Sequence, residues 1–131
     1  MKLVEIDFKL LVSDGTSTMF TTEGTYEEFK DFRRIQFYEQ TELKALTIID
    51  IYEEKIILNR KGNELSMKME YIKNTDTTVF LTTNFNYELS MNCTTLFLEI
   101  LYKEIKVVYQ TETDKEQNLT HNLLIKWTNK K

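Results

Sequence analysis

Glu39, Arg60 and His121 each stand at one end of a row of alternating apolar residues. An isolated charge among apolar side chains is very costly, so such residues are expected to be paired. Glu39 is the natural counter-ion of Arg60. One interpretation is therefore an ion pair that fixes strand register or closes one end of a barrel, with His121 as a hydrogen-bonded core residue.

A second interpretation is a polar anchor inside a small cavity. The planar donor fork of Arg60 suits carboxylates and phosphates, so the expected partner is a small anionic or amphipathic molecule. In the alternation of the strands, Tyr87, Tyr109 and Trp127 occupy positions on the same face as the apolar rows. They are therefore expected to point inward and to line this cavity. Trp127 is equally compatible with a role as a core plug.

Catalysis is a third interpretation. A lyase or isomerase would use Glu39, Arg60 and either His121 or a tyrosine hydroxyl, an expectation that rests on analogy between barrels. No nucleophile is placed beside His121, the single histidine. His121 and Cys93 lack zinc-ligand spacing, and residues 112–118 lack the glycine of a calcium loop. The sequence thus favours a non-enzymatic protein without metal or cofactor, and predicts Cys93 to be a core residue.

The composition limits the classes of partner and compartment. The chain has 131 residues and a net charge of −4, which argues against nucleic-acid binding. Glu5 and Asp7 interrupt the apolar N-terminal stretch, and no apolar run is long enough to span a membrane. A single cysteine fits a reducing compartment. These features predict a cytoplasmic protein that binds neither nucleic acid nor membrane.

Period-two alternation, the signature of β-strands, runs through most of the chain. Residues 4–12 and 20–26 form rows on either side of a turn at Asp14-Gly15. A second hairpin folded at Lys30-Asp31 places Glu27 and Glu28 opposite arginines, a pairing that favours this register. A short helix capped by Thr25 is the alternative.

A third hairpin is predicted for residues 55–69, folded at Gly62-Asn63. In this register Arg60 faces Leu65 on the apolar face. Moving the loop to Lys61-Gly62 changes the cross-strand partners but not the faces, because the shift is by an even number of positions. The location of Arg60 on the apolar face therefore does not depend on the turn.

Further strands are predicted around residues 46–52, 79–83, 87–93, 105–109 and 119–127. Residues 96–102 are apolar on both faces and fit a doubly buried strand or a short helix. The count of eight to ten strands predicts an all-β protein, a single domain over 1–131. Closure of this antiparallel meander into a barrel would remove its edges. Such a barrel is filled by side chains or holds one small ligand. Self-association through an exposed strand is a further alternative.

Four short motifs carry a family resemblance: "FYE" (37–39), "RKG" (60–62), "YQT" (109–111) and "HNLLIKW" (121–127). With them the chain resembles the YwiB-like family, small bacterial proteins of unassigned function. The similar steps are Tyr38-Glu39, the turn from Arg60 to Gly62, and His121-Asn122. The resemblance implies a calycin-like, lipocalin-type barrel and carries no activity with it. Residues 96–103 look shorter and more apolar than in the relatives.

Overall fold

The computed structural model describes residues 1–42, 44–83, 88–112 and 118–130, and these form one closed antiparallel barrel. Every strand pairs with the next in the chain, and the first pairs with the last. The predicted all-β meander barrel of the calycin type is confirmed. The ten described strands are β1 (Lys2–Val12), β2 (Ser17–Glu28), β3 (Arg33–Tyr38), β4 (Leu46–Ile51), β5 (Lys55–Lys61), β6 (Leu65–Ile72), β7 (Asp76–Thr83), β8 (Glu88–Ile100), β9 (Glu104–Glu112) and β10 (Asn118–Asn129).

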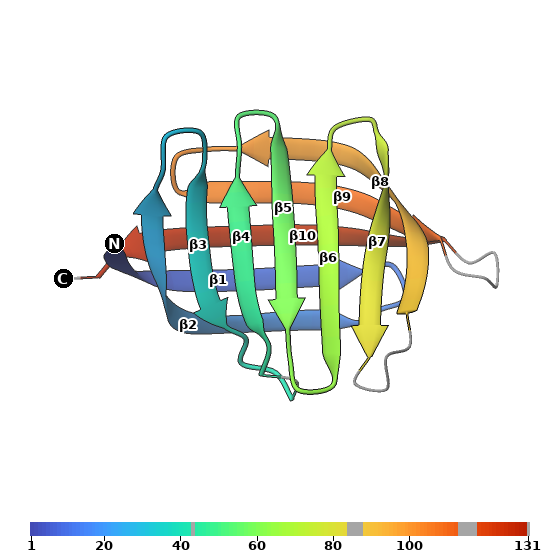
Figure 1. The fold of residues 1–131 in the computed structure, drawn as a ribbon, viewed down its shortest axis with the longest axis horizontal. Helices are drawn as coiled ribbons and strands as arrows, with labels where there is room; N and C mark the ends of the chain where they lie inside the picture. The colour runs from blue at the N-terminus through green and yellow to red at the C-terminus, as the bar shows by residue number, and fades with distance from the viewer. Residues whose placement is uncertain (43, 84–87, 113–117, 131) are drawn as a thin grey trace.

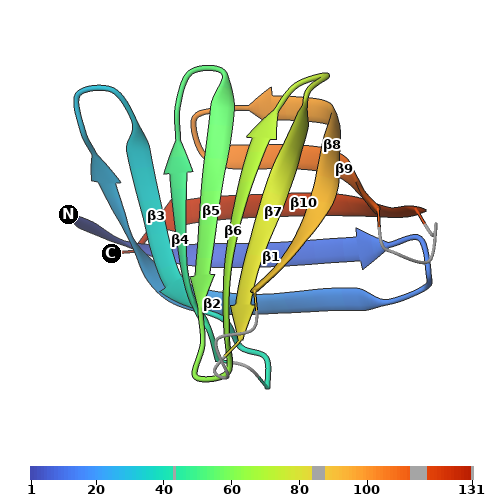
Figure 2. The same cartoon turned by 45° about the vertical axis from the view of Figure 1, so that its right-hand side comes forward.

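The barrel is flattened into two layers whose strands cross at a steep angle (Figures 1 and 2). Strands β3 to β7 run together in one layer, and β1, β9 and β10 run across them in the other. The long strands β2 and β8 belong to both layers. β2 pairs with β1 along most of its length and with β3 over its last residues, while β8 passes from β7 to β9. Strands that change layer must bend.

The two bends have different local causes. In β2, a Cβ atom on Gly24 would lie 2.5 Å from both the carbonyl oxygen of Gln36 and Cδ1 of Ile6. Only glycine lets the neighbouring strand approach this closely. In β8, the register with β9 shifts between Thr95 and Phe97. Such a β-bulge bends its strand and increases the local twist.

The core is built from the inward rows that the alternation predicts. Burial alternates along nearly every strand, so one face of each strand contributes to a single cluster inside the barrel. Cys93 lies fully buried in this cluster, as expected. The side chains with the least exposure include Val4, Ile6, Ile35, Ile49, Ile51, Ile56, Tyr71, Val79, Ile105, Val107 and Ile125.

The second hairpin has the predicted register. Glu27 lies opposite Arg34 and Glu28 opposite Arg33, and the alternative helix after Thr25 is wrong. The ion pair of Arg34, however, is made with Asp50 on β4, where Nε and Oδ1 are 2.7 Å apart. Because β3 has neighbours on both sides, a cross-strand charge pattern read from one hairpin does not decide which partner the arginine takes.

The third hairpin is displaced by two residues from the predicted register. Its loop is Asn63-Glu64, closed by a hydrogen bond of 2.8 Å from the Gly62 amide to the Leu65 carbonyl. Arg60 therefore faces Met67 rather than Leu65. The displacement is even, so every side chain keeps its predicted face.

The ambiguous segment is a strand as far as Ile100. β8 continues to Ile100, so the helix proposed for residues 96–102 is wrong. The doubly buried alternative is also wrong, since Leu96 and Phe97 are 44% and 39% exposed. The bulge breaks the alternation here, which explains why the sequence shows no clear period. No helix in the described part of the chain is long and apolar enough to cross a membrane.

Candidate ligand pocket at the barrel mouth

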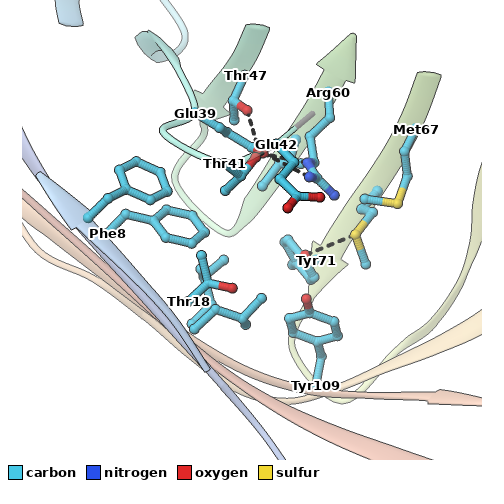
Figure 3. A pocket seen from close by; sticks show the side chains of 15 residues that line it. Phe8, Thr18, Glu39, Thr41, Glu42, Thr47, Arg60, Met67, Tyr71 and Tyr109 are labelled. Atoms are coloured by element: carbon cyan, nitrogen blue, oxygen red, sulfur yellow. Dashed lines mark hydrogen bonds and ion pairs between the residues drawn. The ribbon is translucent and has the colours of Figure 1, made fainter. Parts of the chain in front are cut away.

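A pocket of about 380 Å³ lies at the end of the barrel where β3 and β5 finish and β2, β4 and β6 begin (Figure 3). Its polar side carries the predicted pair Glu39 and Arg60. Apolar and aromatic side chains form most of the remaining wall. The fifteen lining residues are Phe8, Leu10, Thr18, Phe20, Glu39, Thr41, Glu42, Thr47, Leu58, Arg60, Met67, Met69, Tyr71, Tyr109 and Leu123.

Glu39 and Arg60 form a bidentate ion pair. Arg60 Nε lies 2.6 Å from Glu39 Oε1, and Arg60 Nη2 lies 2.8 Å from Oε2. Thr47 donates a further hydrogen bond of 2.8 Å to Oε1, and Thr41 donates one of 3.4 Å to Oε2. Each carboxylate oxygen thus accepts two hydrogen bonds, which satisfies a charge that is almost fully buried.

Local structure explains why these groups meet. Glu39 directly follows β3, and its amide donates to the Ala45 carbonyl at 2.9 Å, which holds the start of the connecting loop against the start of β4. Thr47 on β4 lies directly opposite Arg60 on β5. Two neighbouring strand positions therefore present a hydroxyl and a guanidinium to the same carboxylate.

Two tyrosines form the floor of the pocket. The rings of Tyr71 and Tyr109 are 4.8 Å apart, and the Tyr71 hydroxyl donates to Met69 Sδ at 3.2 Å. Burial raises the pKa of Tyr109 to about 12. Burial also raises the pKa of Tyr71 well above its usual value, and the neighbouring Tyr109 adds to this effect. Both hydroxyls stay neutral near pH 7 and can serve as hydrogen-bond donors.

His121 lies behind Tyr109, outside the set of described residues that line the pocket. The two rings stack with centroids 4.5 Å apart, and Nε2 is 2.9 Å from Thr111 Oγ1. Burial lowers the pKa of His121, although Asp14 opposes this effect. Its Nδ1 is buried and has no hydrogen-bond partner among the described residues. The histidine thus supports an aromatic wall and does not face the cavity.

The remaining predicted site residues lie elsewhere. Trp127 is buried at the other end of the barrel, stacked on Tyr26 with centroids 6.2 Å apart, and Arg33 lies 5.8 Å from the centre of its ring. Tyr87 lies outside the described residues. Tyr38 points away from the core and is largely exposed. Of the expected cavity residues, the structure brings Glu39, Arg60 and Tyr109 together.

Several pocket residues were not singled out from the sequence. Phe8 and Phe20 stack with centroids 4.7 Å apart and line the pocket, and Figure 3 shows Phe8 across the cavity from Arg60. Their inward parity was evident, but parity does not show how far along the barrel a residue lies. Thr47 could be found only by adding the β4–β5 register to the position of Arg60. Glu42, in the loop after β3, carries no periodic signal.

The geometry limits the chemistry of the pocket. The Glu39 carboxylate already accepts four hydrogen bonds, and most of them come from charged or buried donors. Transfer of a proton to this carboxylate would require one of these hydrogen bonds to break. In this arrangement Glu39 acts as a counter-ion. Among the described residues, no group of three or more His, Cys, Asp or Glu side chains is placed to hold a metal ion.

A closed meander of ten strands within the described residues, with a partly apolar pocket at one mouth, defines a lipocalin-like barrel protein. The chain belongs to the family of domains of unknown function DUF1934, whose model matches residues 8–125. This match and the structural similarity to the ywiB protein of Bacillus subtilis together confirm the resemblance to the YwiB-like family.

The chain is also similar to the crystal structure of the ywiB protein from Bacillus subtilis. The TM-score is 0.81 at 19% sequence identity, over 99% of this chain and 93% of that one. At this identity the likeness concerns the fold. A comparison with curated proteins gives no match.

Proposed function

We propose that this barrel is a non-enzymatic, cytoplasmic binding protein for a small anionic or amphipathic molecule. The ligand places its polar end on Arg60 and its apolar body against the aromatic wall. The observation that supports this proposal is that one cavity combines an arginine with unused hydrogen-bond donors and a mostly apolar wall. Ligand sites commonly have this make-up, a mostly apolar surface with a few fixed polar groups.

Arg60 has donors to spare. Nε and one N–H of Nη2 are used by Glu39, and within the described residues Nη1 makes no hydrogen bond. The side chain is 26% exposed, so water reaches it. Figure 3 shows the guanidinium on the pocket side of β5. A ligand carboxylate, phosphate or carbonyl can therefore replace water at these donors without breaking the pair.

The apolar side of the pocket suits a small hydrophobic body. Phe8 and Phe20 stack on each other, and Leu58, Met67 and Met69 line the pocket from β5 and β6. Methionine side chains adapt readily to ligands of different shape. The volume of about 380 Å³ is at the small end of the range for ligand sites, which favours a molecule of one or two rings or a short alkyl chain.

A pocket-filling substitution tests this proposal. Thr18 lines the pocket from β2, and Thr25 stands on the outer face of the same strand. A panel of small aryl and alkyl carboxylates, phosphates, alcohols and amines is screened by thermal shift and measured by calorimetry. We expect Thr18→Phe to abolish the binding seen with wild type, and the control Thr25→Phe to preserve it. Equal binding by both variants, or no binding of any panel member to wild type, would exclude the pocket.

A further inference from the structure

We propose that the ligand carries an ammonium group, and that Glu42 recognises it. This inference rests on the proposed function and names the class of ligand: an amphipathic amine or zwitterion with an apolar body. A hydrogen-bond acceptor on the same molecule would occupy the free donors of Arg60. The balance of charge in the pocket and the position of Glu42 support this assignment.

The charges of the ionisable groups that line the pocket do not sum to zero. Arg60 contributes one positive charge, and Glu39 and Glu42 contribute two negative charges, so the net charge is −1. Arg60 is neutralised by its bidentate contact with Glu39. The tyrosines Tyr71 and Tyr109 remain neutral, since burial raises the pKa of each. The uncompensated charge of the pocket is therefore that of Glu42.

Glu42 is placed to contact a bound molecule. Its side chain lines the pocket from the loop after β3, and Figure 3 shows its carboxylate directed into the cavity. Within the described ranges it has neither an ion-pair partner nor a hydrogen-bond partner. Glu42 is exposed to solvent at the mouth of the pocket, so it attracts a cation with the modest, screened strength of a surface ion pair.

The two charged positions differ in what they can accept. A ligand that is only anionic gains hydrogen bonds from Arg60 but meets the repulsion of Glu42. A ligand with an ammonium group gains at Glu42, and any acceptor it carries still reaches Arg60. Like-charge contacts select against a ligand as effectively as favourable contacts select for one. The pocket thus discriminates by the sign of the ligand charge.

Three probes with the same phenyl body separate these effects: 2-phenylethylamine, 3-phenylpropanoate and phenylalanine, which carries both groups. Binding is measured by calorimetry to wild type, Glu42→Gln and Glu64→Gln. Glu64 lies in the β5–β6 loop near the same end of the barrel and is outside the pocket lining. The control therefore removes the same charge from the same region.

We expect wild type to bind the amine and the zwitterion more tightly than the carboxylate. Glu42→Gln should weaken binding of the amine about fivefold, the factor expected for a partly exposed ion pair, and strengthen binding of the carboxylate. Glu64→Gln should leave all three affinities nearly unchanged. An amine that binds no better than the carboxylate, that does not bind at all, or that is insensitive to Glu42→Gln overturns the inference.

These results remain distinguishable from a failure of the proposed function. In one outcome the amine fails to bind, while another panel member binds to wild type but not to Thr18→Phe. In that case the pocket is a ligand site and only the assignment of Glu42 is wrong. If Thr18→Phe changes no affinity, both proposals fall.

Discussion

Water reaches the two members of the buried ion pair unequally. The side chain of Glu39 is 4% exposed and that of Arg60 is 26% exposed. A carboxylate left alone at the Glu39 position would have Thr41 and Thr47 as its remaining donors, whereas an arginine left alone could turn part of its guanidinium to solvent. The cost of losing either partner should therefore depend on which one remains.

Arg60→Met is expected to lower the free energy of unfolding by about 3–5 kcal/mol, because it leaves a buried unpaired charge. Glu39→Gln keeps an acceptor for Thr47 and leaves the more exposed partner, so about 1–3 kcal/mol is expected. The double variant should be more stable than Arg60→Met alone. Urea denaturation of the four proteins in a double-mutant cycle provides the measurement.

Equal costs for the two single variants would contradict this asymmetry. Costs of at most about 1 kcal/mol for both would mean that the pair behaves as a surface salt bridge. Circular dichroism of each variant confirms that the barrel still forms, so that the comparison refers to one folded state.

Parity was enough to predict the faces of Arg60 and Glu39 and to suggest their pairing. It was not enough to separate Trp127 from Arg60, because residues on one face of different strands can lie at opposite ends of a barrel. The same limit applies to His121, which shares the inward parity but lies behind Tyr109. Depth along the barrel depends on the stagger of all strands, and the sequence shows only one strand at a time.

At the scale of elements, the bend in β2 depends on the close approach at Gly24. The strand passes there from β1 to β3, and the carbonyl oxygen of Gln36 occupies the space that a Cβ would need. A side chain at this position must push β3 away or displace Ile6. Since β3 leads directly to Glu39, the bend also positions the ion pair.

Gly24→Ala should therefore destabilise the barrel by about 1–3 kcal/mol, the usual cost of overpacking. Gly15→Ala is the informative comparison. Gly15 has open space around it but a φ of +95°, so its substitution causes backbone strain in the β1–β2 turn without a steric clash in the barrel. We expect Gly24→Ala alone to perturb the NMR shifts of Ile6 and Phe37, which can be followed together with urea unfolding. Unchanged shifts and stability would exclude the close approach.

The strands themselves were largely predictable from sequence, but the bends were not. Hydrophobic alternation identified the hairpins because a one-residue slip would bury the wrong face. The loop of the third hairpin was displaced by two residues because an even slip carries no such penalty. The bulge near Phe97 breaks the alternation itself, so the segment that turns the corner was also the one with the weakest signal.

At the scale of the whole molecule, folding buries several weak acids in their neutral form. Burial raises the pKa of the Cys93 thiol to about 11 from an ordinary value of 9.0, and that of Tyr109 to about 12 from 10.0. A raised pKa means that the folded chain holds its proton to higher pH than the unfolded chain. The stability from these groups is complete below about pH 9 and is lost as pH rises through the folded values.

The free energy of unfolding should thus fall steeply above about pH 9. Tyr109→Phe keeps the ring but removes one ionising hydroxyl, so the slope of stability against pH should become shallower between about pH 10 and pH 12. Tyr38→Phe is the control, because its ring remains 62% exposed after folding. Urea unfolding across this pH range gives the slopes. Identical slopes for wild type and Tyr109→Phe would argue against a buried neutral phenol.

Closure of the barrel through β1 and β10 also affects the order in which the strands can pair during synthesis. All other neighbouring strands are joined by short connections, but Val12 pairs with His121, roughly a hundred residues away. During synthesis β1 can form its hairpin with β2 early, yet its other edge stays without a partner until β10 leaves the ribosome. Closing such a long loop is slow, and an unpaired edge is prone to pair with other chains. We therefore expect the chain to be most prone to aggregation after β1 has formed and before β10 is available to pair with it.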